Sequence, residues 1–178
     1  MQIKRALFSV WNKDGIVELG QFLAAQNIEI LSTGGTKEVL EKAGLDITSI
    51  SHLTGSGAVM DGRVKTLHPK VFGGILADRE NPQHLHDLEY LNGLAIDLVV
   101  VNFYPFVQET VKKKLEFKEA IEFIDIGGPS MIRAAAKNYH SVLPLCDTSL
   151  YTEFMDIFTE TDGAIPLDFR KKMASKVF

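Results

Sequence analysis

Apolar runs of strand length alternate along this chain with segments in which apolar residues recur at helical spacing. The run at residues 96–102 is rich in valine and almost wholly apolar, as expected for a strand buried on both faces of a parallel sheet. The alternation continues from one end of the chain to the other and predicts an α/β fold with a mainly parallel sheet. The expected strands cover residues 6–10, 28–31, 46–50, 96–102 and 141–146.

Helices are expected between these strands and after the last of them. Asn12 or Asp14 is available to cap the first helix, whereas residues 51–76 show no clear period and indicate a long loop with some strand. Loops of this length in compact domains are usually functional. The last helix meets no terminator before Phe178, so we expect the chain to end within it. The expected helices cover residues 16–23, 39–43, 82–91, 117–123, 129–137, 149–158 and 166–178.

Composition narrows the classes of protein that the chain can belong to. Its 178 residues, without a linker or repeat, predict one domain over residues 1–178 with a sizeable core. The formal charge of −4 argues against a nucleic-acid partner, and no apolar stretch reaches the roughly 18 residues of a membrane span. Cys146 is the only cysteine, which excludes an internal disulfide and a cysteine-rich zinc site. We therefore expect a cytoplasmic protein with no membrane partner and no bound metal.

Polar residues follow several expected strands, and α/β proteins bind ligands at the carboxyl ends of parallel strands. After the second strand, residues 32–37 read Ser-Thr-Gly-Gly-Thr-Lys and lead into a helix. The two glycines allow an oxyanion to approach the backbone, and the helix N–H groups, the hydroxyls and the lysine can donate to it. The pattern predicts a phosphate site, and a Gly-Gly turn followed by a threonine cap explains it equally well.

A second candidate lies in the long loop, where residues 62–69 read Gly-Arg-Val-Lys-Thr-Leu-His-Pro. Arg63 and Lys65 are two residues apart, so they project from the same side of an extended chain. An anionic ligand would stabilise two neighbouring cations, whereas the structural alternative is a solvated loop. His68 is equally explained as a turn residue before Pro69, and no histidine has metal-ligand spacing.

A third candidate is the Asp-Ile-Gly-Gly-Pro string at residues 125–129, which leads into a helix. Ser130, Arg133 and Lys137 share one face of that helix. Each charged residue has a structural alternative, because Asp125 can cap the helix, Arg133 can be solvated and Lys137 can complement the carboxyl end of the helix.

The valine-rich strand ends in a fourth string, Asn-Phe-Tyr-Pro at residues 102–105. Pro105 keeps Tyr104 extended, which aims the tyrosine hydroxyl from the strand end. The alternative is that these aromatic residues belong to the core, as aromatic residues usually do.

Together these strings resemble the IMP cyclohydrolase domain of the bifunctional purine-biosynthesis protein, whose other half is AICAR formyltransferase. The most specific strings are Arg-Val-Lys-Thr-Leu-His-Pro at 63–69 and Arg-Ala-Ala-Ala-Lys-Asn at 133–138, and the resemblance covers nearly the whole chain. It implies a methylglyoxal-synthase-like three-layer sandwich, a homodimer normally fused to the formyltransferase domain, and no cofactor. The chain departs from the family at Trp11-Asn12, where Ser-Asp is usual.

The resemblance implies closure of 5-formamidoimidazole-4-carboxamide ribotide to inosine monophosphate (IMP), with release of water. The carboxamide nitrogen attacks the formyl carbon, so catalysis needs proton removal, oxyanion stabilisation and proton delivery to departing hydroxide. We expect Lys65 and Tyr104 to act on the formyl oxygen, and Asp125 and Lys137 to handle the amide proton and the leaving water, with the individual proton transfers left open. The implied substrate-binding residues are Asn12, Lys13, Ser32, Thr33, Gly34, Gly35, Thr36, Arg63, Thr66, Asn102, Ile126 and Gly127.

Two other functions are compatible with a glycine-rich phosphate loop. Methylglyoxal synthase carries such a loop, but its elimination chemistry requires carboxylates beside the phosphate. The candidate catalytic residues of this chain are instead mainly Lys65, Tyr104 and Lys137. A noncatalytic nucleotide-binding regulatory domain, like that of carbamoyl phosphate synthetase, needs the loop but not the cluster of lysine, tyrosine and aspartate.

Overall fold

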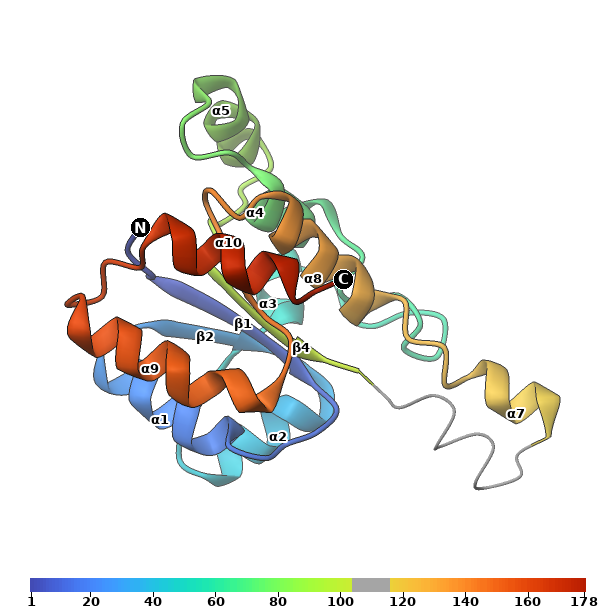
Figure 1. Cartoon of the computed structure of the whole chain (residues 1–178). Helices are drawn as coiled ribbons and strands as arrows, with labels where there is room; N and C mark the ends of the chain where they lie inside the picture. Colours follow the sequence, from blue (N-terminus) through green and yellow to red (C-terminus); the bar gives the residue numbers. More distant parts are fainter. Residues whose placement is uncertain (104–115) are drawn as a thin grey trace.

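The computed structural model describes residues 1–103 and 116–178, so Tyr104 lies outside the described residues. Within them, five strands form one sheet in the order β3-β2-β1-β4-β5, and every pairing is parallel (Figure 1). This confirms the predicted α/β class and its parallel sheet. The strands are β1 (Arg5–Val10), β2 (Glu29–Ser32), β3 (Thr48–Ser49), β4 (Leu98–Asn102) and β5 (Leu143–Leu145).

Helices cover both faces of this sheet, and together with it they form three layers. A 3₁₀ turn, η1 (Thr148–Leu150), leads directly into α9. The helices are α1 (Ile16–Ala25), α2 (Gly34–Lys42), α3 (Ile50–Thr54), α4 (Pro69–Leu76), α5 (Pro82–Tyr90), α7 (Phe117–Ile121), α8 (Gly127–Lys137), α9 (Tyr151–Glu160) and α10 (Leu167–Ser175).

Alternate residues of β1 supply two separate apolar cores, because successive side chains of a strand point to opposite faces. Ala6 and Phe8 belong to the core beneath α1, α9 and α10, and Figure 1 shows α1 and α9 running together along that face. Leu7 belongs to the other core, which packs against α3, α4 and α8. Phe8 and Leu7 are both completely buried, which explains why the central strand is apolar at every such position.

The prediction of a long loop at residues 51–76 is wrong in part, because the structure has two helices there. Ser49 caps α3 by accepting a hydrogen bond from the backbone N–H of His52, and α3 replaces the end of the strand expected at 46–50. His68 caps α4, since its ring nitrogen accepts from the N–H of Lys70 at 3.1 Å. The glycines within α4 and the brevity of both helices hide the helical period in the sequence.

The boundaries of several other elements also differ from those expected. The first helix has Gly15 at its N-cap, with φ 70°, rather than Asn12 or Asp14. Two helices begin earlier than expected, α2 at Gly34 and α8 at Gly127, because glycines in a first turn carry no apolar signal. The last helix, α10, ends at Ser175 instead of running on to Phe178.

Tyr151 opens α9 and is buried beneath the loop that joins β1 to α1, where its ring lies 3.4 Å from the position of a Cβ added to Gly15. Burial raises the pKa of Tyr151 to about 12, and the neighbouring side chain of Asn102 partly opposes that rise. The folded protein therefore keeps a proton that the unfolded chain loses above its ordinary pKa of 10.0. This contribution to stability is complete below pH 10 and declines as the pH rises toward 12.

We predict that Tyr151→Phe flattens the pH dependence of the unfolding free energy between pH 10 and pH 12, because the variant has no phenol to ionise. Urea denaturation at a series of alkaline pH values measures this slope. Tyr90 is 82% exposed, so Tyr90→Phe is the matched control and should follow the wild type. Equal slopes for wild type and Tyr151→Phe would contradict the prediction.

Candidate functional site

A cavity of about 640 Å³ lies at the carboxyl edge of the sheet, where the loops after β1 and β2 meet the end of β4 and two other segments. This volume is in the range of pockets that hold small ligands. Most of the residues predicted for the site converge here, although they come from five separate parts of the chain. The lining residues are Ser9, Val10, Trp11, Lys13, Thr33, Gly34, Gly35, Thr36, Asp61, Gly62, Arg63, Lys65, Thr66, Asn102 and residues 121–128.

One end of the cavity is formed by the amino terminus of α2. Thr33 occupies the N-cap without a side-chain cap hydrogen bond, so the first-turn N–H groups have no acceptor from that side chain. Gly34 has φ 55°, a left-handed conformation that favours glycine, and a Cβ there would lie 3.6 Å from the Lys65 ammonium. A helix amino terminus and a nearby ammonium together attract an anion.

Lys13 brings a second ammonium to the cavity. Its Nζ donates to the carbonyl oxygens of Val10 and Trp11, the latter at 3.1 Å. Burial lowers the pKa of Lys13, as desolvation does for any ammonium. Within the described part of the chain, neither Lys13 nor Lys65 belongs to an ion pair.

Two hydroxyls predicted to bind substrate are instead occupied inside the protein. Ser32 is completely buried and donates to the carbonyl of Phe8 at 2.9 Å, and it does not line the cavity. Thr36 lines the cavity, but its Oγ1 donates to the Val10 carbonyl at 2.9 Å and accepts from the Val10 N–H at 3.1 Å. Of the three hydroxyls in the predicted phosphate loop, only that of Thr33 faces the cavity without such a bond.

The opposite end of the cavity is formed by the amino terminus of α8. Asp125 Oδ1 accepts a hydrogen bond from the Gly128 N–H at 3.1 Å, so the carboxylate caps the helix and also lines the cavity. A Cβ at Gly128 would lie 2.4 Å from Asp125 Oδ2, and one at Gly127 would lie 2.6 Å from the hydroxyl of Thr66. These contacts explain the Gly-Gly pair, because side chains there would displace Asp125 and Thr66.

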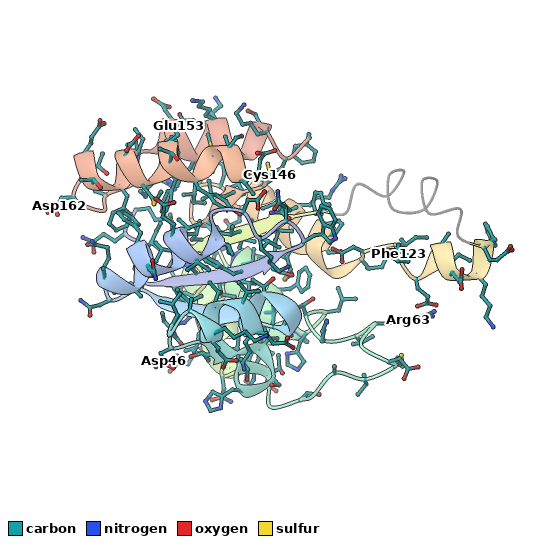
Figure 2. The ribbon with its side chains drawn as sticks, turned by 90° about the horizontal axis from the view of Figure 1, so that it is seen from below. Asp46, Arg63, Phe123, Cys146, Glu153 and Asp162 are labelled. Atoms are coloured by element: carbon teal, nitrogen blue, oxygen red, sulfur yellow. The ribbon has the colours of Figure 1, made fainter. Side chains whose placement is uncertain are left out.

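Arg63 lines the cavity, but in this structure its guanidinium is paired with the carboxylate of Glu122. Figure 2 shows Arg63 on the side of the molecule that also carries Phe123, although the two residues belong to distant parts of the chain. Both side chains of the Arg63–Glu122 pair are more than half exposed, so water weakens their attraction. The predicted cationic pair at 63 and 65 is therefore split, with only Lys65 left beside α2.

Besides Ser32, three predicted site residues lie outside the cavity or outside the described residues. Asn12 does not line the cavity, and its Oδ1 accepts from the N–H of Asp14 at 2.9 Å. Lys137 is exposed at the far end of α8, about 14 Å along the helix axis from Gly128. The neighbouring Asn138 donates to the carbonyls of Ile75 and Ala77, which places Lys137 near the opposite edge of the sheet. Tyr104 lies outside the described residues.

Two acidic residues that line the cavity, Asp61 and Glu122, are not among the predicted site residues. Asp61 precedes Gly62 in a turn where both residues have positive φ, so its Asp-Gly pair was a signal that could have been used. Glu122 has no comparable signal, because its approach to Arg63 joins residues 59 positions apart in the chain.

Comparison with known proteins places this chain in a family. Residues 15–130 match the MGS-like domain, and the chain belongs to that family. Its relatives include the bifunctional purine biosynthesis protein PurH of Clostridium kluyveri, 48% identical over 176 residues, and PurH of Rhodospirillum rubrum, 49% identical over 178 residues. These matches cover 99% and 100% of this chain but 35% and 34% of the relatives, so the chain spans about a third of their length.

A solved structure supports the same relationship. The crystal structure of ForH is 34% identical, has a TM-score of 0.84, and aligns over 99% of this chain and 91% of its own. The predicted resemblance and its sandwich fold are confirmed. Among the described residues, no helix combines the length and apolarity needed to cross a membrane.

We predict that Thr36→Val lowers the free energy of unfolding by about 1–3 kcal/mol, because it leaves the buried N–H of Val10 without its acceptor. Thr152→Val, at an exposed position of α9, makes the same chemical change and should stay within about 0.5 kcal/mol of wild type. Urea denaturation at pH 7 measures both variants. If they are equally stable, the hydroxyl does not fix Val10.

Proposed function

We propose that this chain is an IMP cyclohydrolase that closes 5-formamidoimidazole-4-carboxamide ribotide to IMP in purine biosynthesis, in the cytoplasm. The observation that carries the proposal is the polarity of one cavity. Lys13, Lys65 and the α2 amino terminus form a cationic end, whereas Asp125 provides a carboxylate at the α8 end. A ribotide has the complementary polarity, with a phosphate at one end and a base that must exchange protons at the other.

The cationic end is assigned to the phosphate. The N–H groups of Gly34 and Gly35 and the hydroxyl of Thr33 would donate to it, with Lys13 supplying charge. Lys65, which lies beside Gly34 and also lines the cavity, would reach from this end toward the formyl oxygen. Arg63 would leave Glu122 to contact the sugar, and Thr66, Ile126 and Gly127 would surround the base.

The chemistry at the other end requires one C–N bond to form and one molecule of water to leave. As the carboxamide nitrogen attacks the formyl carbon, it loses one proton to the formyl oxygen. The formamide nitrogen then loses its own proton and forms a C=N bond as the C–O bond breaks, so that the oxygen leaves as water with both protons. Asp125 is proposed to handle the amide proton, held in place by the Gly128 N–H, with Tyr104 and Lys65 acting on the formyl oxygen. Because the reaction is intramolecular, holding the two groups in contact supplies much of the rate enhancement.

The direct test mixes the purified chain with the formylated ribotide and follows the formation of IMP by absorbance. Turnover is the expected result. Tight binding of IMP without turnover would instead support a noncatalytic regulatory domain, and elimination of phosphate from dihydroxyacetone phosphate would support a methylglyoxal synthase.

We predict that Asp125→Asn lowers kcat about 100-fold or more while the Kd for IMP changes little, because the amide can still accept from Gly128 but cannot take a proton.

Lys13→Ala should raise KM about tenfold with a smaller change in kcat, since it removes a charge from the phosphate end. Steady-state kinetics and calorimetric titration with IMP distinguish the two. A variant of Asp125 that loses only affinity would reduce the residue to a ligand contact.

We further propose that the chain works as a homodimer and that Lys137 acts in the cavity of a second copy. Its place at the far end of α8 keeps it from the cavity of its own chain. The segment that carries α7 stands away from the sheet in Figure 1 and exposes apolar side chains that a second copy would cover. These are Phe117, Ile121 and Ile124, with exposures of 81%, 42% and 53%.

Mixing two inactive variants tests this arrangement. Asp125→Asn and Lys137→Ala should each lose activity alone, and a mixture that exchanges subunits should recover up to about a quarter of it, because one of the two cavities in each mixed dimer is intact. Analytical ultracentrifugation of the wild type gives the oligomeric state. A monomer, or a mixture as inactive as its components, would contradict the proposal.

A further inference from the structure

The side chain of Asn102 forms hydrogen bonds with the backbone of the loop that joins β1 to α1. Asn102 ends β4 and pairs in register with Val10 of β1. Its Oδ1 accepts from the N–H groups of Trp11 and Asn12, both at 2.8 Å, and its Nδ2 donates to the carbonyl of Asn12 at 3.0 Å. An amide oxygen has two lone pairs, so no acceptor capacity is left for a ligand.

A second side chain, that of Thr36, holds the start of the same loop by hydrogen bonds. Thr36, in the first turn of α2, bonds to both the N–H and the carbonyl of Val10. Val10 therefore connects β1 to the helix end that forms the cationic end of the cavity, while Asn102 fixes the two residues that follow. The loop backbone is held at consecutive residues by β4 and α2.

Lys13 depends on that backbone for its position. Its ammonium donates to the carbonyls of Val10 and Trp11. Thr36 holds the first of these residues, and Asn102 holds the second. Without the Asn102 side chain, the Asn12 N–H would lose its acceptor, and the Trp11 N–H would keep only the backbone carbonyl of residue 102 at 3.4 Å. The Trp11 carbonyl, one of the two that orient Lys13, would then be less firmly held, whereas Thr36 would still hold the Val10 carbonyl.

We infer that Asn102 is a positioning residue, whose side chain fixes the loop backbone that orients the Lys13 ammonium at the cationic end of the cavity. This inference rests on the proposed function insofar as the ligand is a phosphorylated nucleotide. The consequence is specific, because loss of Asn102 weakens recognition of the phosphate and leaves recognition of the nucleoside intact.

A double-mutant cycle with a ligand series tests the inference. Wild type, Asn102→Ala, Lys13→Ala and the double variant are titrated with IMP, ribose 5-phosphate and inosine, using ligand-observed NMR for the weak complexes. We expect Asn102→Ala to weaken both phosphorylated ligands about tenfold and inosine less than about twofold, and the double variant to match Lys13→Ala. Equal losses for inosine and IMP, or losses that multiply in the double variant, would overturn the inference.

A measurement on the free protein separates this inference from the proposed function. In the wild type, burial lowers the pKa of Lys13, so an NMR titration of the Lys13 Cε signal should show that pKa rising toward its ordinary value in Asn102→Ala. An unchanged titration would refute the positioning role even if IMP binds. If the wild type binds neither IMP nor ribose 5-phosphate, the proposed function fails, and the Lys13 titration still decides the role of Asn102.

Circular dichroism establishes whether Asn102→Ala is folded. If it is not, Asn102→Ser replaces it, because its hydroxyl can still accept one of the two loop N–H groups. We expect this variant to give a smaller loss for IMP than alanine would, about threefold, again without a loss for inosine.

Discussion

The parallel pairing of β1 with β4 at the centre of the sheet is the constraint on which the cavity depends. It sets Val10 beside Asn102 and brings together loops that lie about 90 residues apart in the chain. Because both strands are completely buried along most of their length, their register cannot slip without exposing apolar side chains to water. The positions of the α2 and α8 amino termini follow from that central pair.

The architecture could be predicted because its signals are local. The valine run that forms β4 and the alternation of strands with helices are visible without any knowledge of tertiary contacts, and both predictions are confirmed. The short helices α3 and α4 could not be predicted in the same way. These helices begin at N-cap residues, Ser49 and His68, whose side chains accept backbone hydrogen bonds. Both residue types also occur often in turns, so they do not identify a helix in the sequence.

The site could likewise be predicted only where its residues are consecutive in the sequence, and not where a side chain depends on a partner distant in the chain. Motifs at residues 33–36, 63–66 and 125–127 identified the cavity because each carries its chemistry in consecutive residues. What a side chain does within the fold depends on partners elsewhere. Ser32 and Thr36 look like ligand donors in sequence, yet both bond to the β1 backbone, and Arg63 is paired with Glu122. Lys137 shares a helix with cavity residues but lies at the wrong end of it.

Trp11 is the only tryptophan in the chain, and it stands at the rim of the cavity with 39% of its surface exposed. Its backbone N–H is held by Asn102, so the indole is attached to one of the fixed points of the loop. When tryptophan is excited selectively, the emission of the protein therefore comes from a side chain at the rim of the cavity. Any molecule that enters the cavity would change the surroundings of this indole, so its fluorescence would report binding in real time without an added label.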